Sequence, residues 1–176
     1  NFEMLFKDSR FILAIRNTVA MSIIILAASF ITAIALAILL NEVQNRKFKK
    51  IAQSVTYLPH FLSWVIVCGL AFNFLGTGDG IINVLLKQIG ILEKGIPWLG
   101  TPELFWWVMG ALHVWKELGW NSIIYLASIS AISPELYEAA HMDGANRFQK
   151  IRYITLPGIK STVIVLLIMN LGFILN

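Results

Sequence analysis

Two adjacent charges in an otherwise apolar stretch are the residues best placed to do chemistry. Lys116 and Glu117 lie between Trp115 on one side and Trp120 and Asn121 on the other. If that stretch spans a membrane, a charge at its centre costs about 2.5–3.5 kcal/mol, so it faces protein or a water-filled cavity and marks a functional site. Neighbours in a helix point about 100° apart. The sequence therefore predicts that these two charges do not pair with each other.

Three interpretations of Lys116 stay open from the residues alone. An ammonium group beside indole rings suits a polar ligand rich in hydroxyl groups. On that interpretation Trp115, Lys116, Trp120 and Asn121 are candidates for the lining of a transport path. The second interpretation is a salt bridge to a neighbouring helix, because buried charges are usually paired. The third is a break in the helix near the membrane surface.

The spacing of the other polar residues does not support catalysis or metal binding. No nucleophile and base lie at a catalytic spacing, and His60, His113 and His141 are scattered over different segments. We therefore predict no catalytic and no metal-binding residues. The glycines of segment 76–80 lack the spacing of a phosphate-binding loop, so nucleotide hydrolysis would belong to a separate chain. We expect no enzyme activity and no cofactor bound by this chain.

The composition of the chain indicates a membrane protein. Of its 176 residues, 57% are hydrophobic and 14% are charged, against about 45–50% and about 25% in soluble domains. The apolar residues fall into blocks at 18–40, 55–75, 104–133 and 159–176, and a spanning helix needs about 20 mostly apolar residues. The sequence predicts an all-α, polytopic membrane protein. Its formal charge of +4 lies at the ends of the blocks and indicates topology, with no nucleic-acid partner.

Basic residues between the blocks predict which segments face the cytoplasm. Segments 41–54 and 134–160 have a basic excess, and the positive-inside rule places both inside. Segment 76–103 has no such excess and belongs outside. The N-terminal segment 1–16 is then outside by parity. We expect that the chain is a fragment and that an earlier spanning helix precedes it in the full protein.

The apolar blocks also predict the elements that position the charged pair. The first helix spans 18–40 and carries small residues that allow close helix packing. The second begins near Ser54, and Pro59 bends its entry or delays its start. Residues 81–91 have the periodicity of a short amphipathic helix at the outer surface. The third helix opens with an aromatic group at the membrane interface, and a fourth begins after Pro157.

Segment 133–157 has the pattern of two short helices joined by a tight turn. Ser133, Pro134 and Glu135 are typical of a helix start, with a hydroxyl cap, a proline at the first position and an acid in the first turn. This helix reaches a turn at Asp143-Gly144, and the next one ends at Leu156-Pro157. Composition alone leaves two roles open, a docking element for a soluble partner or a helix pair that lies on lipid.

The residues of this segment form a distinctive string. It consists of Glu138-Ala139-Ala140, Asp143-Gly144-Ala145, Phe148, Ile151 and Thr155-Leu156-Pro157. The string resembles the signature loop, or EAA motif, of the membrane-spanning permease subunits of bacterial ABC importers. Segments 57–59, 80–83, 115–119 and 134–137 are similar to the carbohydrate branch of that family. Within that branch, segments 57–64 and 125–127 are similar to permeases for polysaccharides or oligosaccharides.

The resemblance implies a fold and a set of coupling residues. The fold is that of a type I ABC importer permease, in which residues 1–176 form a single transmembrane domain with about four of six spanning helices. Within it, segment 133–157 would be the cytoplasmic coupling-helix loop. The residues that would couple the permease to an ATPase are Glu138, Ala139, Ala140, Asp143, Gly144 and Ala145. Glu138 would contact a basic residue of the ATPase, and Gly144 would allow the tight turn.

The resemblance also implies partners and a location. The partners would be ABC ATPase subunits that hold ATP and Mg, a second permease subunit in a heterodimer, and an extracellular solute-binding protein. This complex would lie in the bacterial cell membrane. It would translocate a sugar or oligosaccharide into the cell by alternating access.

Two other functions compete with an importer at this stage. An ion-coupled secondary carrier would use Lys116 or Glu117 as its titrating group. An intramembrane enzyme would use Ser128, Ser130 or the same two charged residues as catalytic groups. The cytoplasmic loop distinguishes an importer from an enzyme, because an ATP-driven importer needs a docking pattern there and an enzyme does not.

Overall fold

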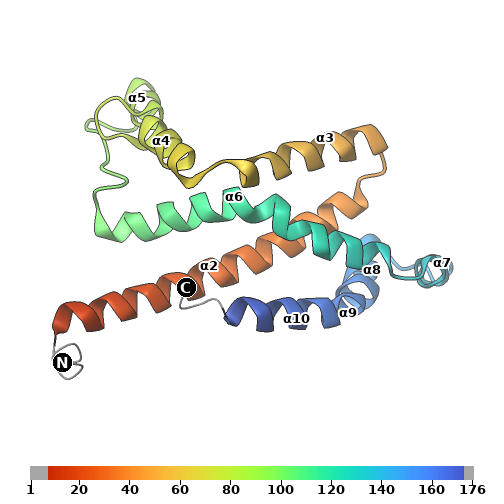
Figure 1. Cartoon of the computed structure of the whole chain (residues 1–176). Coiled ribbons are helices and arrows are strands. Elements are labelled where there is room, and N and C mark those ends of the chain that lie inside the picture. The colour runs from red at the N-terminus through yellow and green to blue at the C-terminus, as the bar shows by residue number, and fades with distance from the viewer. Residues whose placement is uncertain (1–7, 173–176) are drawn as a thin grey trace.

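The computed structural model describes residues 8–172, and every regular element in that range is a helix (Figure 1). Two long helices, α2 (Ser9–Glu42) and α6 (Pro102–Ser130), lie side by side and run in the same direction. Small residues of α2 allow this close contact, as the sequence predicts. The core between them consists of Ala33, Ala37 and Leu40 of α2, Tyr125, Leu126 and Ile129 of α6, and Ile159.

The first helix is longer at its N-terminus than the predicted 18–40. Asp8 caps it, because its side chain accepts a hydrogen bond from the backbone N–H of Arg10 at 2.9 Å. The residues between the cap and the apolar block favour a helix, so α2 begins before the apolar block does. Of the predicted outer segment 1–16, residues 1–7 lie outside the described residues.

The second apolar block forms a sharply bent pair of helices. The chain runs through α3 (Arg46–Tyr57) and the 3-10 turn η1 (Leu58–Phe61) into α4 (Trp64–Leu75), with a bend of 103°. The predicted bend at Pro59 is confirmed, but the predicted helix start near Ser54 is wrong. Asn45 caps α3 by accepting from the backbone N–H groups of Lys47 and Phe48, so the basic segment is itself helical.

A buried asparagine organises the predicted outer segment around the short helix α5 (Ile81–Gln88). The side-chain amide of Asn83 donates to the carbonyl oxygens of Gly76 and Ile96, both at 2.9 Å. Its Oδ1 accepts from the backbone N–H of Ile96 at 3.0 Å and from Trp98 Nε1 at 3.1 Å. The predicted amphipathic helix is therefore present, and Asn83 fastens it to the loop that follows.

The described helices differ in how well they suit a membrane. Within residues 8–172, α2 is the one helix that is long and apolar enough to cross by itself, and the number rises to three if each of two bent pairs counts as one span. Helix α6 has 29 residues, but Lys116, Glu117 and its amide and hydroxyl side chains lower its apolarity.

The C-terminal segment stays helical through Pro157. It consists of α7 (Pro134–Met142), α8 (Arg147–Lys150), the π-helical turn η2 (Ile151–Thr155), α9 (Leu156–Gly158) and α10 (Lys160–Leu171). The second short helix ends at Gly158, one residue after the predicted end at Leu156-Pro157. The π turn bonds the N–H of Leu156 to the carbonyl oxygen of Ile151 and leads the chain into Pro157 at the start of α9, where no N–H is needed. The path then bends by 56° into α10.

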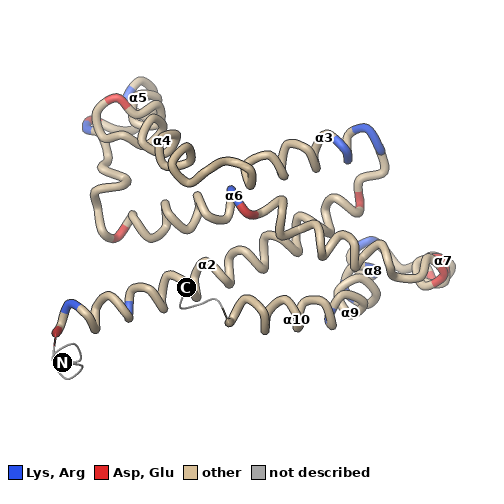
Figure 2. Tube along the Cα trace, in the orientation of Figure 1, with Lys and Arg blue, Asp and Glu red and all other residues tan. Residues whose placement is uncertain are grey.

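The charges separate into two ends of the molecule (Figure 2). Basic residues gather where α3 begins and around α8, and these two segments lie at the same end. The α4–α5 segment and the start of α2 lie toward the other end. This arrangement agrees with the predicted topology, which places segments 41–54 and 134–160 on one side and segment 76–103 on the other.

Candidate functional site

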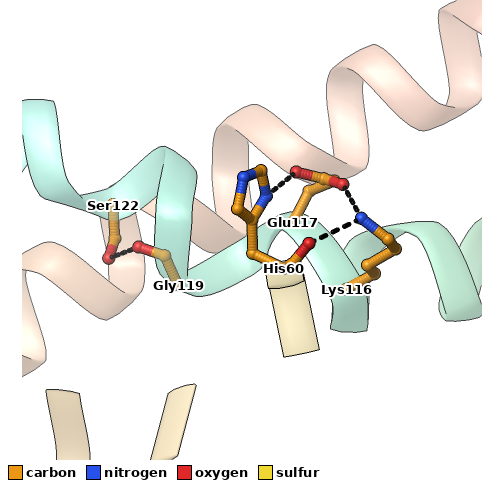
Figure 3. A network of polar contacts seen from close by, with 5 residues as sticks. All are labelled: His60, Lys116, Glu117, Gly119 and Ser122. Carbon is orange, nitrogen blue, oxygen red and sulfur yellow. Dashed lines mark hydrogen bonds and ion pairs between the residues drawn. The ribbon is translucent and has the colours of Figure 1, made fainter. Parts of the chain in front are cut away.

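A network of polar contacts joins the bend of the second span to the middle of α6 (Figure 3). Lys116 Nζ lies 2.8 Å from Glu117 Oε1 and donates to the carbonyl oxygen of His60 at 3.0 Å. The other carboxylate oxygen of Glu117 lies 2.7 Å from His60 Nδ1. The prediction that the two charges do not pair is therefore wrong. Their long side chains both reach toward η1, where His60 offers each of them a partner.

Aromatic rings surround this network. The His60 ring is stacked on Trp120 with centroids 4.3 Å apart and planes 2° apart. The ammonium group of Lys116 lies 5.5 Å from the ring centroid of Trp64, which in turn stacks on His113. Lys116 is only 6% exposed, so its charge is satisfied by Glu117, a backbone carbonyl and an indole face.

The backbone at the end of α3 also lies in close contact with α6, at Gly119. Gly119 lies against the end of α3, where a Cβ atom would overlap the carbonyl oxygen of Thr56 and approach Tyr57 to 2.9 Å. The hydroxyl of Ser122 donates to the carbonyl oxygen of Gly119 at 2.7 Å. The glycine and the polar network together fix the bent span on α6.

A cavity of about 500 Å³ lies between α2, α6 and α10. Its lining mixes apolar and aromatic side chains with hydroxyl and amide groups, a combination that suits a polar organic ligand. The residues that line it are Ser22, Ile25, Leu26, Ser29, Phe30 and Ala33 of α2, His113, Trp120, Asn121, Ile123, Ile124 and Tyr125 of α6, and Leu166 and Asn170 of α10. Ser29 Oγ is buried and has no hydrogen-bond partner among residues 8–172.

The four residues predicted to line a path take different positions. Trp120 and Asn121 line the cavity. Lys116 lies in the polar network beside it, and Trp115 is 44% exposed. His60 contacts both the network and Trp120, but the sequence analysis does not predict it as a site residue. Its position directly after Pro59, at the break between two helices, is the local signal for its importance.

The predicted coupling residues form a tight helical hairpin. Gly144 has a φ of +75°, and α7 ends in a Schellman motif, with Ala145 N–H donating to Ala140 O at 2.9 Å and Gly144 N–H to His141 O at 3.1 Å. The predicted role of glycine in the turn is thus confirmed. Most of the predicted coupling residues are accessible to a partner. Glu138, Ala139, Asp143 and Gly144 are exposed, and Ala140 and Ala145 are half-buried.

The first turns of α7 show two unpredicted details. Pro134 occupies the first turn as predicted, but the side chain of Ser133 makes no capping hydrogen bond. Tyr137 Oη lies 2.9 Å from Thr155 Oγ1 in the π turn, a contact that no local pattern indicates. Among residues 8–172, no three His, Cys, Asp or Glu side chains form a group that could hold a metal ion.

Comparison with known proteins identifies the family. Residues 33–176 match the family described as binding-protein-dependent transport system inner membrane component. The chain belongs to this family. The resemblance inferred from the loop residues is thereby confirmed, and the family's location makes this chain part of a multi-pass protein of the plasma membrane.

Relatives and solved structures of the family agree with this assignment. The chain is 45% identical over 172 residues to the polygalacturonan/rhamnogalacturonan transport system permease protein YteP of Bacillus subtilis, and the match covers 98% of this chain and 53% of YteP. Protein LplB of the same organism is 39% identical over 175 residues, which cover 99% of this chain and 54% of LplB. The chain thus spans about half the length of these relatives.

The fold matches that of a solved transporter. A crystal structure of a bacterial ABC transporter involved in the import of the acidic polysaccharide alginate superposes with a TM-score of 0.94 at 44% identity, covering 99% of this chain and 60% of that one. A second structure, in complex with an alginate pentasaccharide-bound periplasmic protein, has the same TM-score. The predicted all-α permease fold is confirmed.

Proposed function

We propose that this chain is part of the permease subunit of an ATP-driven importer that moves an oligosaccharide into the cell. The observation that carries the proposal is the hairpin of α7 and α8, which presents an exposed Glu138 and a glycine turn at the basic end of a chain of this family. A rigid helical hairpin at the cytoplasmic end is what an ATPase needs in order to move the membrane helices.

The proposed partners follow from this function. Two ABC ATPase subunits would carry ATP and Mg, so this chain itself would bind no cofactor and catalyse no reaction. A second permease subunit would complete the path as a heterodimer. An extracellular solute-binding protein would deliver the sugar, and the alginate transporter, which is similar to this chain, was solved with such a periplasmic protein.

The proposed substrate is an oligosaccharide, and the first to test are acidic ones. YteP is a permease protein of a polygalacturonan/rhamnogalacturonan transport system. The solved transporter that resembles this chain is involved in the import of alginate, an acidic polysaccharide. Sugar rings bind aromatic faces and exchange hydrogen bonds with amides and hydroxyls. Trp120 supplies an aromatic face and Asn121 an amide in the cavity beside the polar network.

At the coupling loop, we propose that Glu138 pairs with a basic residue of the ATPase. Ala139, Ala140 and Ala145 would let the two surfaces approach closely, and Asp143 would add a second acceptor. Gly144 supplies the left-handed backbone that directs α7 back toward α8. ATP-driven closure of the ATPases would then displace the whole hairpin.

A pull-down from detergent-solubilised membranes tests the proposal. The full-length protein is expressed with its genomic neighbours as wild type, Glu138→Lys or Glu135→Lys, and the co-purifying chains are identified. We expect wild type to recover an ATPase and Glu138→Lys to lose at least about 90% of it, because a like charge replaces an attractive one at the contact. Glu135→Lys makes the same charge change in the first turn of α7 and should keep the ATPase.

Two outcomes would contradict this proposal. If wild type recovers no ATPase, and uptake in ATP-depleted cells follows an ion gradient, an ion-coupled carrier replaces the importer. If Glu138→Lys and Glu135→Lys lose the ATPase equally, the contact is a general electrostatic attraction and Glu138 has no special role.

A further inference from the structure

A partly buried hydroxyl pair connects the coupling hairpin to the helix that follows it. Tyr137 lies in the first turns of α7, and its Oη is 2.9 Å from Oγ1 of Thr155, which lies 18 residues later in the π turn η2. Thr155 is only 2% exposed. Its hydroxyl also lies 3.5 Å from the carbonyl oxygen of Lys150. The hydrogen bond thus joins α7 directly to the π turn, across the hairpin between them.

The segment between these two residues has few freely rotating joints. The Schellman motif at Gly144 fixes the end of α7. A capping box then fixes the start of α8, because Asn146 Oδ1 accepts from Gln149 N–H at 2.9 Å and Gln149 Oε1 accepts from Asn146 N–H at 2.8 Å. Tyr137, the turn, α8 and Thr155 therefore move as one unit as long as the hydroxyl pair is intact.

Beyond Thr155 the chain enters the bend that leads into the membrane-embedded helix α10. Ile159 is fully buried in the core between α2 and α6. Gly158 lies so close to the end of α6 that a Cβ atom would approach Ile132 Cδ1 to 2.5 Å. The bend is thus packed against both long helices, and a displacement that reaches Thr155 is passed on to them.

We infer that the Tyr137–Thr155 hydrogen bond transmits the movement of the coupling hairpin to α10, so that both are positioning residues for transport. This inference rests on the proposed function. Without the bond, the turn at Gly144 and the short helix α8 are the remaining connection from α7 to η2 within the hairpin, and this longer connection passes on less of the movement of α7. ATP hydrolysis then continues with less transport per cycle.

The test measures the oligosaccharide taken up per ATP hydrolysed in proteoliposomes that contain the complete transporter. The variants are Tyr137→Phe, Thr155→Val and the double variant. Because one hydrogen bond contributes about 0.5–1.5 kcal/mol, we expect each single variant to lower this ratio about two- to tenfold, with the amount of bound ATPase unchanged. The double variant should fall no further than the worse single variant, because both remove the same contact.

Two controls distinguish this role from a general structural one. Thr155→Ser keeps the hydroxyl and should restore the ratio. Tyr153→Phe removes a hydroxyl from the same π turn. Because Tyr153 is 69% exposed, this variant should behave as wild type.

Each remaining outcome decides the inference. A wild-type ratio in Tyr137→Phe overturns it, as do additive losses in the double variant. Loss of the ATPase from the single variants overturns it too, because the residues would then serve docking. If wild type itself binds no ATPase, the proposed function fails and the inference fails with it, and that result is read from wild type alone.

Discussion

At the scale of single residues, the charge balance around Lys116 is the most sensitive feature of the site. Glu117 has its carboxylate between Lys116 and His60, and its side chain is 19% exposed. Replacing Lys116 with methionine leaves a largely buried carboxylate without its cation. We expect Lys116→Met to destabilise the full-length protein by about 1–3 kcal/mol, because a partly exposed pair loses less than a fully buried one. Thermal unfolding of the purified protein in detergent measures this loss.

The double variant Lys116→Met/Glu117→Gln is the matched control for that prediction. It removes both charges and keeps a hydrogen-bonding group beside His60, so it should recover at least half of the stability lost by the single variant. If the double variant is as unstable as Lys116→Met or less stable, the pairing has no energetic role and Lys116 is important for another reason.

The contacts of these residues show where prediction from sequence reaches its limit. The sequence indicates that Lys116 and Glu117 are important, because charges in an apolar helix are costly. It does not indicate their partner, because His60 lies 57 positions before Glu117 and meets it only through the bend at η1. The same holds for Tyr137 and Thr155, which no local spacing connects.

At the scale of elements, the packing of α3 on α6 depends on one glycine. A Cβ atom at Gly119 overlaps the backbone of Thr56, and a backbone carbonyl cannot move aside as a flexible side chain can. We expect Gly119→Ala to displace α3 and to lower the stability of the full-length protein by about 1–3 kcal/mol. Thermal unfolding in detergent tests this expectation.

Gly110 provides the control for this prediction. It lies in the same helix, and a Cβ atom there meets nothing within 4 Å. Gly110→Ala should therefore be neutral or stabilising, because alanine favours a helix by about 1 kcal/mol over glycine. Equal losses in the two variants would show that α6 tolerates no alanine at all, and that the contact with Thr56 is not the cause.

Elements with strong local end signals can be predicted from this sequence, and others cannot. Helix α7 begins at Pro134 and ends before Gly144 as expected, since proline and glycine restrict the backbone locally. Helix α3 is missed because its basic residues indicate a cytoplasmic loop, while its cap, Asn45, is a weak signal by itself. The π turn between α8 and α9 is missed because such a turn has no sequence signature.

At the scale of the whole molecule, function depends on the two ends facing different compartments. The coupling hairpin and the basic start of α3 lie at one end, and the loop organised by Asn83 lies toward the other. The core of small α2 residues and α6 connects them. Motion of the hairpin can therefore reach the cavity between α2, α6 and α10 through contacts within this chain.

Cysteine labelling tests this orientation, because the chain has one cysteine, Cys68, that can be replaced. In a cysteine-free background of the full-length protein, in which Cys68 and any cysteine outside these 176 residues are replaced with serine, single cysteines are placed at Glu93, in the outer loop, and at Gln44, between α2 and α3, both of which are exposed. In right-side-out vesicles, we expect a membrane-impermeant maleimide to label Glu93→Cys and not Gln44→Cys, and permeabilised vesicles should show both. The opposite pattern would place α7 and α8 outside the cell, where no ATPase could reach Glu138, and it would reject the importer.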